Sequence, residues 1–160
     1  MHERTYVDIF MAELLVQANT QNLKQVFSFI NNAISSCGLT PKTHRQIKLC
    51  VEEIFINIVN YAYKDYNDYS HDKQNSIVKI NVDIINDDYI QIVFTDYGKP
   101  FNPLNVQEPD VSLDIGHRKS GGLGIFLVKH VMDSIEYKYE DGTNILTLKK
   151  QFVAGANNGL

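Results

Sequence analysis

The stretch SGGLGIFLVKHVMD, from Ser120 to Asp133, decides how this chain of 160 residues is interpreted. Three glycines, Gly121, Gly122 and Gly124, run directly into an amphipathic helix that we expect at about 125–132. The start of a helix leaves backbone N–H groups unpaired and carries a partial positive charge, which attracts phosphate. Glycines before it let the backbone approach an anion without an intervening side chain. The same pattern also suits a flexible connection to a packed helix.

Composition limits the class of protein. The length fits one domain with a sizeable core, and 44% apolar with 21% charged residues is ordinary for a soluble globular protein. A net charge of −4 argues against a broad nucleic-acid-binding face. No apolar run approaches the roughly 18 residues of a membrane span, and no signal peptide is evident. Cys37 and Cys50 lack metal-type spacing, so we expect reduced thiols in a cytoplasmic protein.

Hydrophobic periodicity predicts helices early in the chain and β-hairpins later. The first helix has Thr20 as its expected N-cap and Gly38 as its stop, and the second opens at Thr40-Pro41. This order is typical of a two-layer α/β sandwich, with a mixed, mostly antiparallel sheet and helices packed on one face. The expected elements are a strand (6–16), two helices (23–34 and 41–62), a hairpin (78–84 and 90–94), a third helix (125–132) and a second hairpin (135–139 and 145–150).

One interval lacks any periodicity. Between Asp96 and Gly121 the chain holds three of its four prolines. Structureless loops longer than about 12–15 residues are uncommon in compact domains and tend to be lids or binding loops. We therefore expect a single domain over residues 1–153, with a lid at about 99–120 and a flexible tail at 154–160.

Glu53 and Asn57 lie four residues apart on the second predicted helix, so their side chains project from one face. The solvated side of any amphipathic helix has the same spacing. The functional interpretation is that the carboxylate accepts a proton while the amide oxygen beside it binds Mg²⁺. Magnesium in phosphoryl-transfer sites takes few protein ligands and keeps waters and substrate phosphates for the rest, so one asparagine oxygen is enough.

Asp96 follows an apolar strand and stands two residues before Gly98. Asp-x-Gly is a frequent turn pattern. Alternatively, the carboxylate accepts a hydrogen bond from an amino group such as that of adenine, and the glycine permits close approach of the ring. Arg118 and Lys119 are either ordinary lid charges or phosphate contacts. Taken with Glu53 and the glycine cluster, this pattern indicates a nucleotide site.

Three segments, VEEIFINIVNYAY, DYGKPFNP and GGLGIFLVKHVMD, resemble the N, G1 and G2 boxes of the Bergerat-fold (GHKL-type) ATPases, which include gyrase and sensor histidine kinases. The sequence is most similar to the bacterial anti-sigma factor serine/threonine protein kinases, from the first helix to about Lys150. The resemblance implies ATP and Mg²⁺ as ligands. It implies that Glu53 is the general base that activates the attacking hydroxyl and that Asn57 holds Mg²⁺. It also implies that Asp96 reads the adenine amino group beside Gly98.

The resemblance extends to further residues and to partners. It implies that the glycine cluster before the third helix faces the phosphates and that Thr147, or else Thr143, supports adenine from the last strand. Where many members have a second glycine, this chain has Pro100-Phe101, a variant of the serine-kinase branch. Where some members carry histidine, it has Tyr61. Such kinases bind a sigma factor, phosphorylate a serine of a STAS-type anti-sigma antagonist, and commonly form homodimers.

Three functions are compatible with these motifs. The first is a protein-serine kinase in which Glu53 deprotonates the serine of a partner. The second is a non-catalytic module that sequesters a partner and uses ATP as a structural or switching ligand. The third is a detached histidine-kinase catalytic domain, which would need a separate partner with an acceptor histidine.

Overall fold

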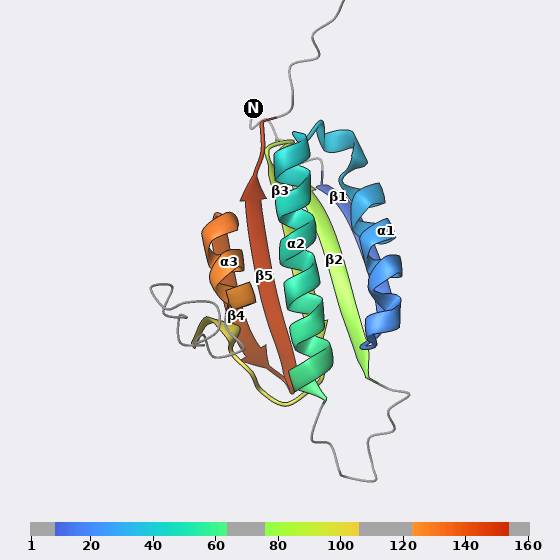
Figure 1. Ribbon diagram of the computed structural model, residues 1–160, viewed down its shortest axis with the longest axis vertical. Coiled ribbons are helices and arrows are strands. Elements are labelled where there is room, and N and C mark those ends of the chain that lie inside the picture. Colours follow the sequence, from blue (N-terminus) through green and yellow to red (C-terminus); the bar gives the residue numbers. More distant parts are fainter. Residues whose placement is uncertain (1–8, 64–75, 106–122, 154–160) are drawn as a thin grey trace, which may run out of the picture.

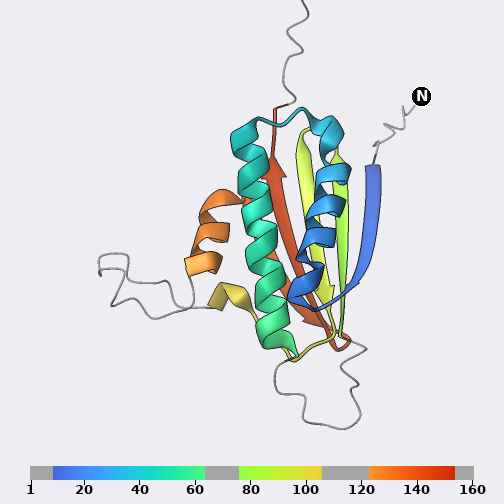
Figure 2. The same cartoon turned by 45° about the vertical axis from the view of Figure 1, so that its right-hand side comes forward.

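The computed structural model describes residues 9–63, 76–105 and 123–153. Five strands form one sheet in the order β1-β2-β3-β5-β4, and three helices cover one of its faces (Figures 1 and 2). The two-layer α/β sandwich is therefore confirmed. All four strand pairings are antiparallel, so within the described residues the sheet is not mixed. The elements are β1 (Ile9–Gln17), α1 (Leu23–Ala33), α2 (Pro41–Asn57), β2 (Ile77–Ile85), β3 (Tyr89–Asp96), α3 (Leu123–Val131), β4 (Ser134–Glu140) and β5 (Thr143–Gln151).

The start of α2 is as the sequence predicts. The Thr40 hydroxyl accepts a hydrogen bond of 3.2 Å from the Thr43 N–H, which satisfies one of the unpaired donors of the first turn. Pro41 occupies the first helical position, where a missing N–H costs nothing. Gly38 adopts a left-handed conformation with φ of 60° and ends the segment that follows α1.

The start of α1 differs from the prediction. The N-cap position of α1 is Asn22, whose side chain makes no capping hydrogen bond. Thr20 is instead the first residue of a 3₁₀ turn that leads into the helix, and this turn is capped by Asn19, which accepts a hydrogen bond of 3.0 Å from the Gln21 N–H. Threonine is a good N-cap residue type, but the extra turn moves the start of the helix along the chain.

The core lies between the three helices and the sheet. Along β2 the burial alternates strictly, which confirms a strand with one face turned toward the helices. Burying each aliphatic side chain of this kind contributes about 1.5–3 kcal/mol. The largest fully buried side chains are Phe55, Phe94, Ile30, Ile47, Ile80, Ile90, Ile92, Leu148, Val26, Val51, Val78 and Val82. The β3–β5 ladder also pairs Asp96 with Asn144, which brings two polar residues to one end of this core.

The C-terminal end of α2 is fixed over the end of β3. The helix continues as a π-helical segment (Ile58–Ala62). The Ala62 carbonyl accepts a hydrogen bond of 3.1 Å from the Lys99 N–H. The hydroxyl of Tyr63 accepts one of 3.0 Å from the Tyr97 N–H. These two hydrogen bonds hold the turn after β3 against the π-helical end of α2. Short π-helical segments are frequent at functional sites.

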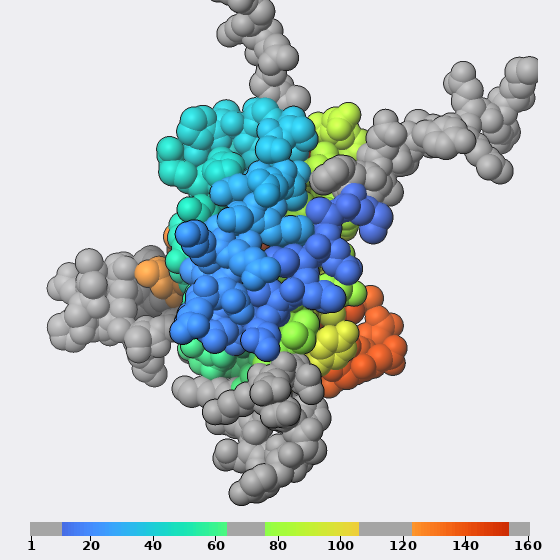
Figure 3. All heavy atoms as spheres, turned by 90° about the vertical axis from the view of Figure 1, so that its right-hand side faces the viewer, coloured from blue at the N-terminus to red at the C-terminus, as the bar shows by residue number. Residues whose placement is uncertain are grey.

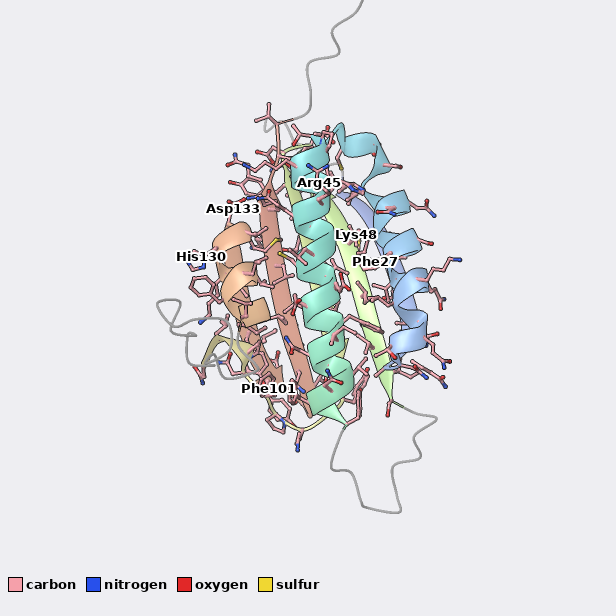
Figure 4. All side chains as sticks on the ribbon, in the orientation of Figure 1. Phe27, Arg45, Lys48, Phe101, His130 and Asp133 are labelled. Atoms are coloured by element: carbon pink, nitrogen blue, oxygen red, sulfur yellow. The ribbon has the colours of Figure 1, made fainter. Side chains whose placement is uncertain are left out.

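Figure 3 faces the edge of the molecule that α1 and β1 form together. The Lys48 ammonium of α2 lies 4.4 Å from the centre of the Phe27 ring of α1, and this cation–π contact links the two helices across their outer surface (Figure 4). None of the helices in the described ranges is long and apolar enough to span a bilayer.

Candidate nucleotide-binding site

A pocket with an empty volume of about 410 Å³ lies between α2, α3 and the sheet, at the end of the sheet where β3 stops and β5 starts. Most of its walls are apolar, and its polar groups come from four residues. It is lined by Ile54, Asn57, Ile58, Ala62, Phe94, Asp96, Phe101, Pro103, Ile125, Tyr137, Asn144 and Leu146.

Asp96 is the buried acceptor of this pocket, with an exposed fraction of 5%. Its Oδ1 accepts hydrogen bonds of 2.9 Å from the Gly98 N–H and from the Asn144 side chain. Within the described part of the chain both hydrogen bonds to the carboxylate go to Oδ1, which leaves Oδ2 available to a ligand. Burial raises the pKa of the Asp96 carboxyl, while the hydrogen bonds from Asn144 and Gly98 oppose that rise.

Asn144 is the residue that holds this carboxylate, and the sequence did not single it out. Besides Asp96, its amide nitrogen donates to the carbonyl oxygens of Gly98 and Lys99 at 3.3 and 3.1 Å. Its Oδ1 accepts a hydrogen bond of 2.7 Å from the Tyr137 hydroxyl, so both the nitrogen and the oxygen of the buried amide form hydrogen bonds. A buried network of hydrogen-bonded polar groups favours one geometry, because breaking any of its hydrogen bonds leaves a buried group unpaired at a cost in free energy.

The same asparagine also holds the backbone of Phe101, another lining residue of the pocket. Asn144 Oδ1 also accepts a hydrogen bond of 3.2 Å from the Phe101 N–H. The Phe101 ring stacks on Tyr61, with centroids 5.9 Å apart and an interplanar angle of 27°. Figure 4 shows Phe101 at the end of α2. The Lys129 ammonium of α3 donates a hydrogen bond of 3.1 Å to the Leu104 carbonyl. This bond holds the 3₁₀ turn Pro103–Asn105, which follows Phe101 in the chain.

Gly98 faces the helix rather than the open pocket. A Cβ on Gly98 would lie 2.5 Å from the Ala62 carbonyl oxygen and 2.6 Å from Ala62 Cβ. The sequence interpretation gave this glycine the task of admitting the adenine ring. The geometry shows that its lack of a side chain is already required for the turn after β3 to pack against the end of α2.

Asn57 and Glu53 both lie on α2, as predicted, and one turn separates them. Asn57 lines the pocket, and within the described residues its side chain forms no hydrogen bond, so its amide oxygen is available to a cation. Glu53 lies just outside the pocket lining, against Gly124 at the start of α3. Burial raises the pKa of the Glu53 carboxyl, and the like charge of Glu52 raises it further. A carboxylate with a raised pKa is better suited to accept a proton.

The structure does not bring Thr147 to the pocket. Successive residues of a strand point to opposite faces, and Thr147 is three residues from Asn144, so it lies on the helix-free face of the sheet. The alternative, Thr143, is adjacent to Asn144 and lies on that face too, with its hydroxyl 3.4 Å from the Asp141 carbonyl. The residue of β5 that reaches the pocket is therefore Asn144.

Several predicted site residues lie outside the described ranges. They are Arg118, Lys119, Gly121 and Gly122, together with most of the predicted lid at 99–120 and the tail at 154–160. Their predicted roles stay predictions. Gly124, the last glycine of the cluster, is described, and it is the second residue of α3.

Comparisons with known proteins identify the family of this domain. The profile of the histidine kinase-like ATPase domain matches residues 16–150. The serine-protein kinase RsbW of Staphylococcus aureus strain MSSA476 is 29% identical over 154 residues, covering 92% of this chain and 91% of the relative. RsbW of S. aureus strain JH9 is similar to the same extent.

A solved structure has the same fold. The RsbU and RsbW domains of Rv1364c from Mycobacterium tuberculosis match with a TM-score of 0.56 at 12% sequence identity. The match covers 89% of this chain and 34% of that longer chain. The profile spans most of the sequence, including α2, the Asp96 turn and α3, and the chain therefore belongs to the histidine kinase-like ATPase domain family.

Proposed function

We propose that this chain is an ATP-dependent protein-serine kinase of the anti-sigma regulatory type. The observation that carries the proposal is the arrangement around one pocket. Asp96 is buried at one end of the pocket, and its Oδ2 accepts no hydrogen bond from the described residues. Asn57 lines the pocket, and Glu53 lies one helical turn from Asn57. The similarity to relatives named as serine-protein kinases supports the same activity.

The pocket fits the adenine end of ATP. Asp96 Oδ2 would accept a hydrogen bond from the exocyclic amino group, while Oδ1 stays bonded to Gly98 and Asn144. The apolar walls, which include Ile54 and Leu146, would bury the faces of the base. This division suits a ligand site, in which apolar contacts supply affinity and a few fixed polar groups supply orientation.

The residues present also fit Mg²⁺. Asn57 offers an amide oxygen free of protein hydrogen bonds within the described residues. The described ranges contain no cluster of three or more His, Cys, Asp or Glu residues that could hold a metal by themselves. A cation here would thus rely on Asn57, water and the nucleotide phosphates, as in many phosphoryl-transfer sites. When bound, Mg²⁺ neutralises charge on the phosphates.

Glu53 would act as the general base. Its carboxylate accepts the proton of the partner's serine hydroxyl as the serine oxygen bonds to the γ-phosphorus of ATP. The bond from that phosphorus to the β–γ bridging oxygen breaks, and the products are phosphoserine and ADP. General base catalysis of this kind contributes about 10²–10⁴-fold, and positioning and electrostatics supply the remaining rate enhancement.

The proposed protein substrate is a STAS-type anti-sigma antagonist, with a sigma factor as a second partner. These partners come from the resemblance to the anti-sigma kinases. Homodimer formation is proposed on the same basis, and a solution mass equal to that of a monomer at working concentration would exclude it.

The direct test is phosphotransfer. The purified chain is incubated with Mg-ATP and each STAS-type protein encoded in the same genome, and phosphorylated residues are located by mass spectrometry. We expect phosphoserine on one of them, and no transfer by Glu53→Gln. ATP binding without transfer would favour the partner-sequestering module instead. Phosphohistidine on a partner would favour a detached histidine-kinase domain.

A further inference from the structure

Gly124, in the first turn of α3, faces the side chain of Glu53 on α2. A Cβ on Gly124 would overlap Glu53 Oε2 and would lie 2.6 Å from Cδ and 3.1 Å from Cγ. Real Cβ atoms essentially never come within 3.0 Å of another atom, so any side chain at position 124 must displace this carboxylate, which stands at the end of a flexible side chain and can move aside. The contact joins two helices that pack directly against each other.

The backbone does not require glycine at this position. The described glycines with positive φ are Gly38 and Gly142, whereas Gly124 has ordinary helical geometry that any residue can adopt. Glycine is also the poorest helix former after proline, because it loses most conformational freedom on folding. Room for the Glu53 carboxylate is therefore the local reason for a glycine here.

No other described group holds Glu53. Within the described residues its carboxylate forms no hydrogen bond and no ion pair, and the start of α3 lies directly against it. The next residue of each helix, Ile54 on α2 and Ile125 on α3, lines the pocket. The contact between Glu53 and Gly124 thus lies next to the lining of the pocket.

We propose that Gly124 is a positioning residue for Glu53, whose carboxylate it admits to the start of α3. This rests on the proposed function in so far as Glu53 is the general base. It differs from the role that the sequence assigned to Gly124, close approach to phosphate, because it acts through the base and not through ATP affinity. Displacing a reacting group by about 1 Å can cost about 100-fold in rate.

The first test measures stability and needs neither nucleotide nor activity. In the wild-type background, Gly124→Ala should raise the Tm little or not at all, because moving the flexible end of Glu53 aside offsets the gain in helix propensity. In a Glu53→Ala background the same change should raise the Tm, because the collision is gone and alanine is the better helix former. An equal Tm change in both backgrounds would overturn the proposal.

The second test distinguishes a role of Gly124 in positioning Glu53 from a role in binding the phosphates of ATP. We expect Gly124→Ala to lower kcat at least about tenfold while the Kd for Mg-ATP stays within about twofold. Added to Glu53→Asp, whose side chain is one methylene shorter, Gly124→Ala should lower kcat by a smaller factor than in the wild type. His130→Ala, an exposed change in the last turn of α3, is the matched control. Weaker ATP binding with unchanged kcat would contradict the proposal in favour of the phosphate role.

These tests distinguish two failures. If the wild type transfers no phosphate although it binds ATP, the proposed function fails, and the Tm comparison alone decides whether Gly124 sets the position of Glu53.

Discussion

Asn144 faces Asp96 across the β3–β5 ladder and donates a hydrogen bond of 2.9 Å to its Oδ1. The donor is itself fixed, because Asn144 Oδ1 accepts from the Tyr137 hydroxyl and the Phe101 N–H. The adenine-reading carboxylate in the proposed site is therefore oriented by the strand next to it. The same asparagine binds the backbone of Phe101, so it connects two parts of the pocket lining.

Asn144→Ala should weaken ATP binding and destabilise the fold together. The change removes one partner of Asp96 and takes the acceptor from the part-buried donors of Tyr137 and Phe101, and each lost hydrogen bond costs about 0.5–1.5 kcal/mol. Calorimetric titration of Mg-ATP and thermal unfolding measure the two effects. Thr147→Ala is the matched control, since Thr147 lies on the same strand but on the helix-free face, and it should change neither.

The pH dependence of ATP binding should report Asp96. Its pKa is raised by burial, and protonation turns Oδ2 from an acceptor into a donor. Affinity for ATP should therefore fall on acidification, beginning at a higher pH than an ordinary aspartate would cause. Titrations across a pH series measure it, and affinity that holds down to the usual aspartate range would contradict the assignment.

The Asp96 carboxyl should also make the stability of the ATP-free protein depend on pH, with higher stability on the acidic side, where ATP affinity is lower. Because the folded-state pKa lies above the unfolded one, the stabilising contribution is complete below the unfolded pKa. It is lost as the pH rises through the folded pKa, where the buried carboxylate ionises. Denaturant titrations of wild type and Asp96→Asn should therefore differ in slope against pH in that window. Parallel curves would show that burial does not perturb Asp96.

Glu53→Gln should keep ATP affinity and reduce phosphotransfer at least about 100-fold, because the amide cannot accept the serine proton. Glu52→Gln is the control, as it removes the neighbouring carboxylate but not the base. It should retain transfer and move the acidic limb of the pH–rate profile to lower pH, since the Glu52 charge raises the pKa of Glu53. Comparable losses in both variants would exclude a specific role for Glu53.

Gly98→Ala should destabilise the end of α2. Its Cβ would meet the Ala62 carbonyl oxygen at 2.5 Å, and that oxygen is held by the Lys99 N–H. Overpacking of this kind typically costs about 1–3 kcal/mol. We expect a lower midpoint in urea and weaker ATP binding, because the turn also carries a donor to Asp96. An unchanged midpoint would mean that the turn can move away from the helix.

Local physics explains which parts of the structure could be predicted. The cap at Thr40, the alternation along β2 and the Glu53–Asn57 spacing depend on neighbours within a few residues, and the structure places all of them as expected. The prediction of Thr20 as the N-cap of the first helix was wrong, because a 3₁₀ turn precedes the helix and Asn22 occupies its N-cap position.

The rest depends on contacts between distant segments. Asn144 matters because antiparallel pairing sets it opposite Asp96, 48 residues earlier, and a one-residue change of register would have exposed it instead. Thr147 was preferred for its residue type, without knowledge of which face of the strand it occupies. In the same way, the room that Gly98 and Gly124 provide becomes visible only when the partner helix is in place.

Calorimetric titration of Mg-ATP into wild type and Asp96→Asn, with thermal unfolding of both, tests the central claim most directly. Asn at position 96 can still accept hydrogen bonds from Gly98 and Asn144 but removes a buried charge. The account predicts that ATP affinity falls at least about tenfold, which is about 1.4 kcal/mol, while the Tm of the free protein stays equal or rises. Equal ATP affinity in both proteins, or no binding by the wild type, would contradict it.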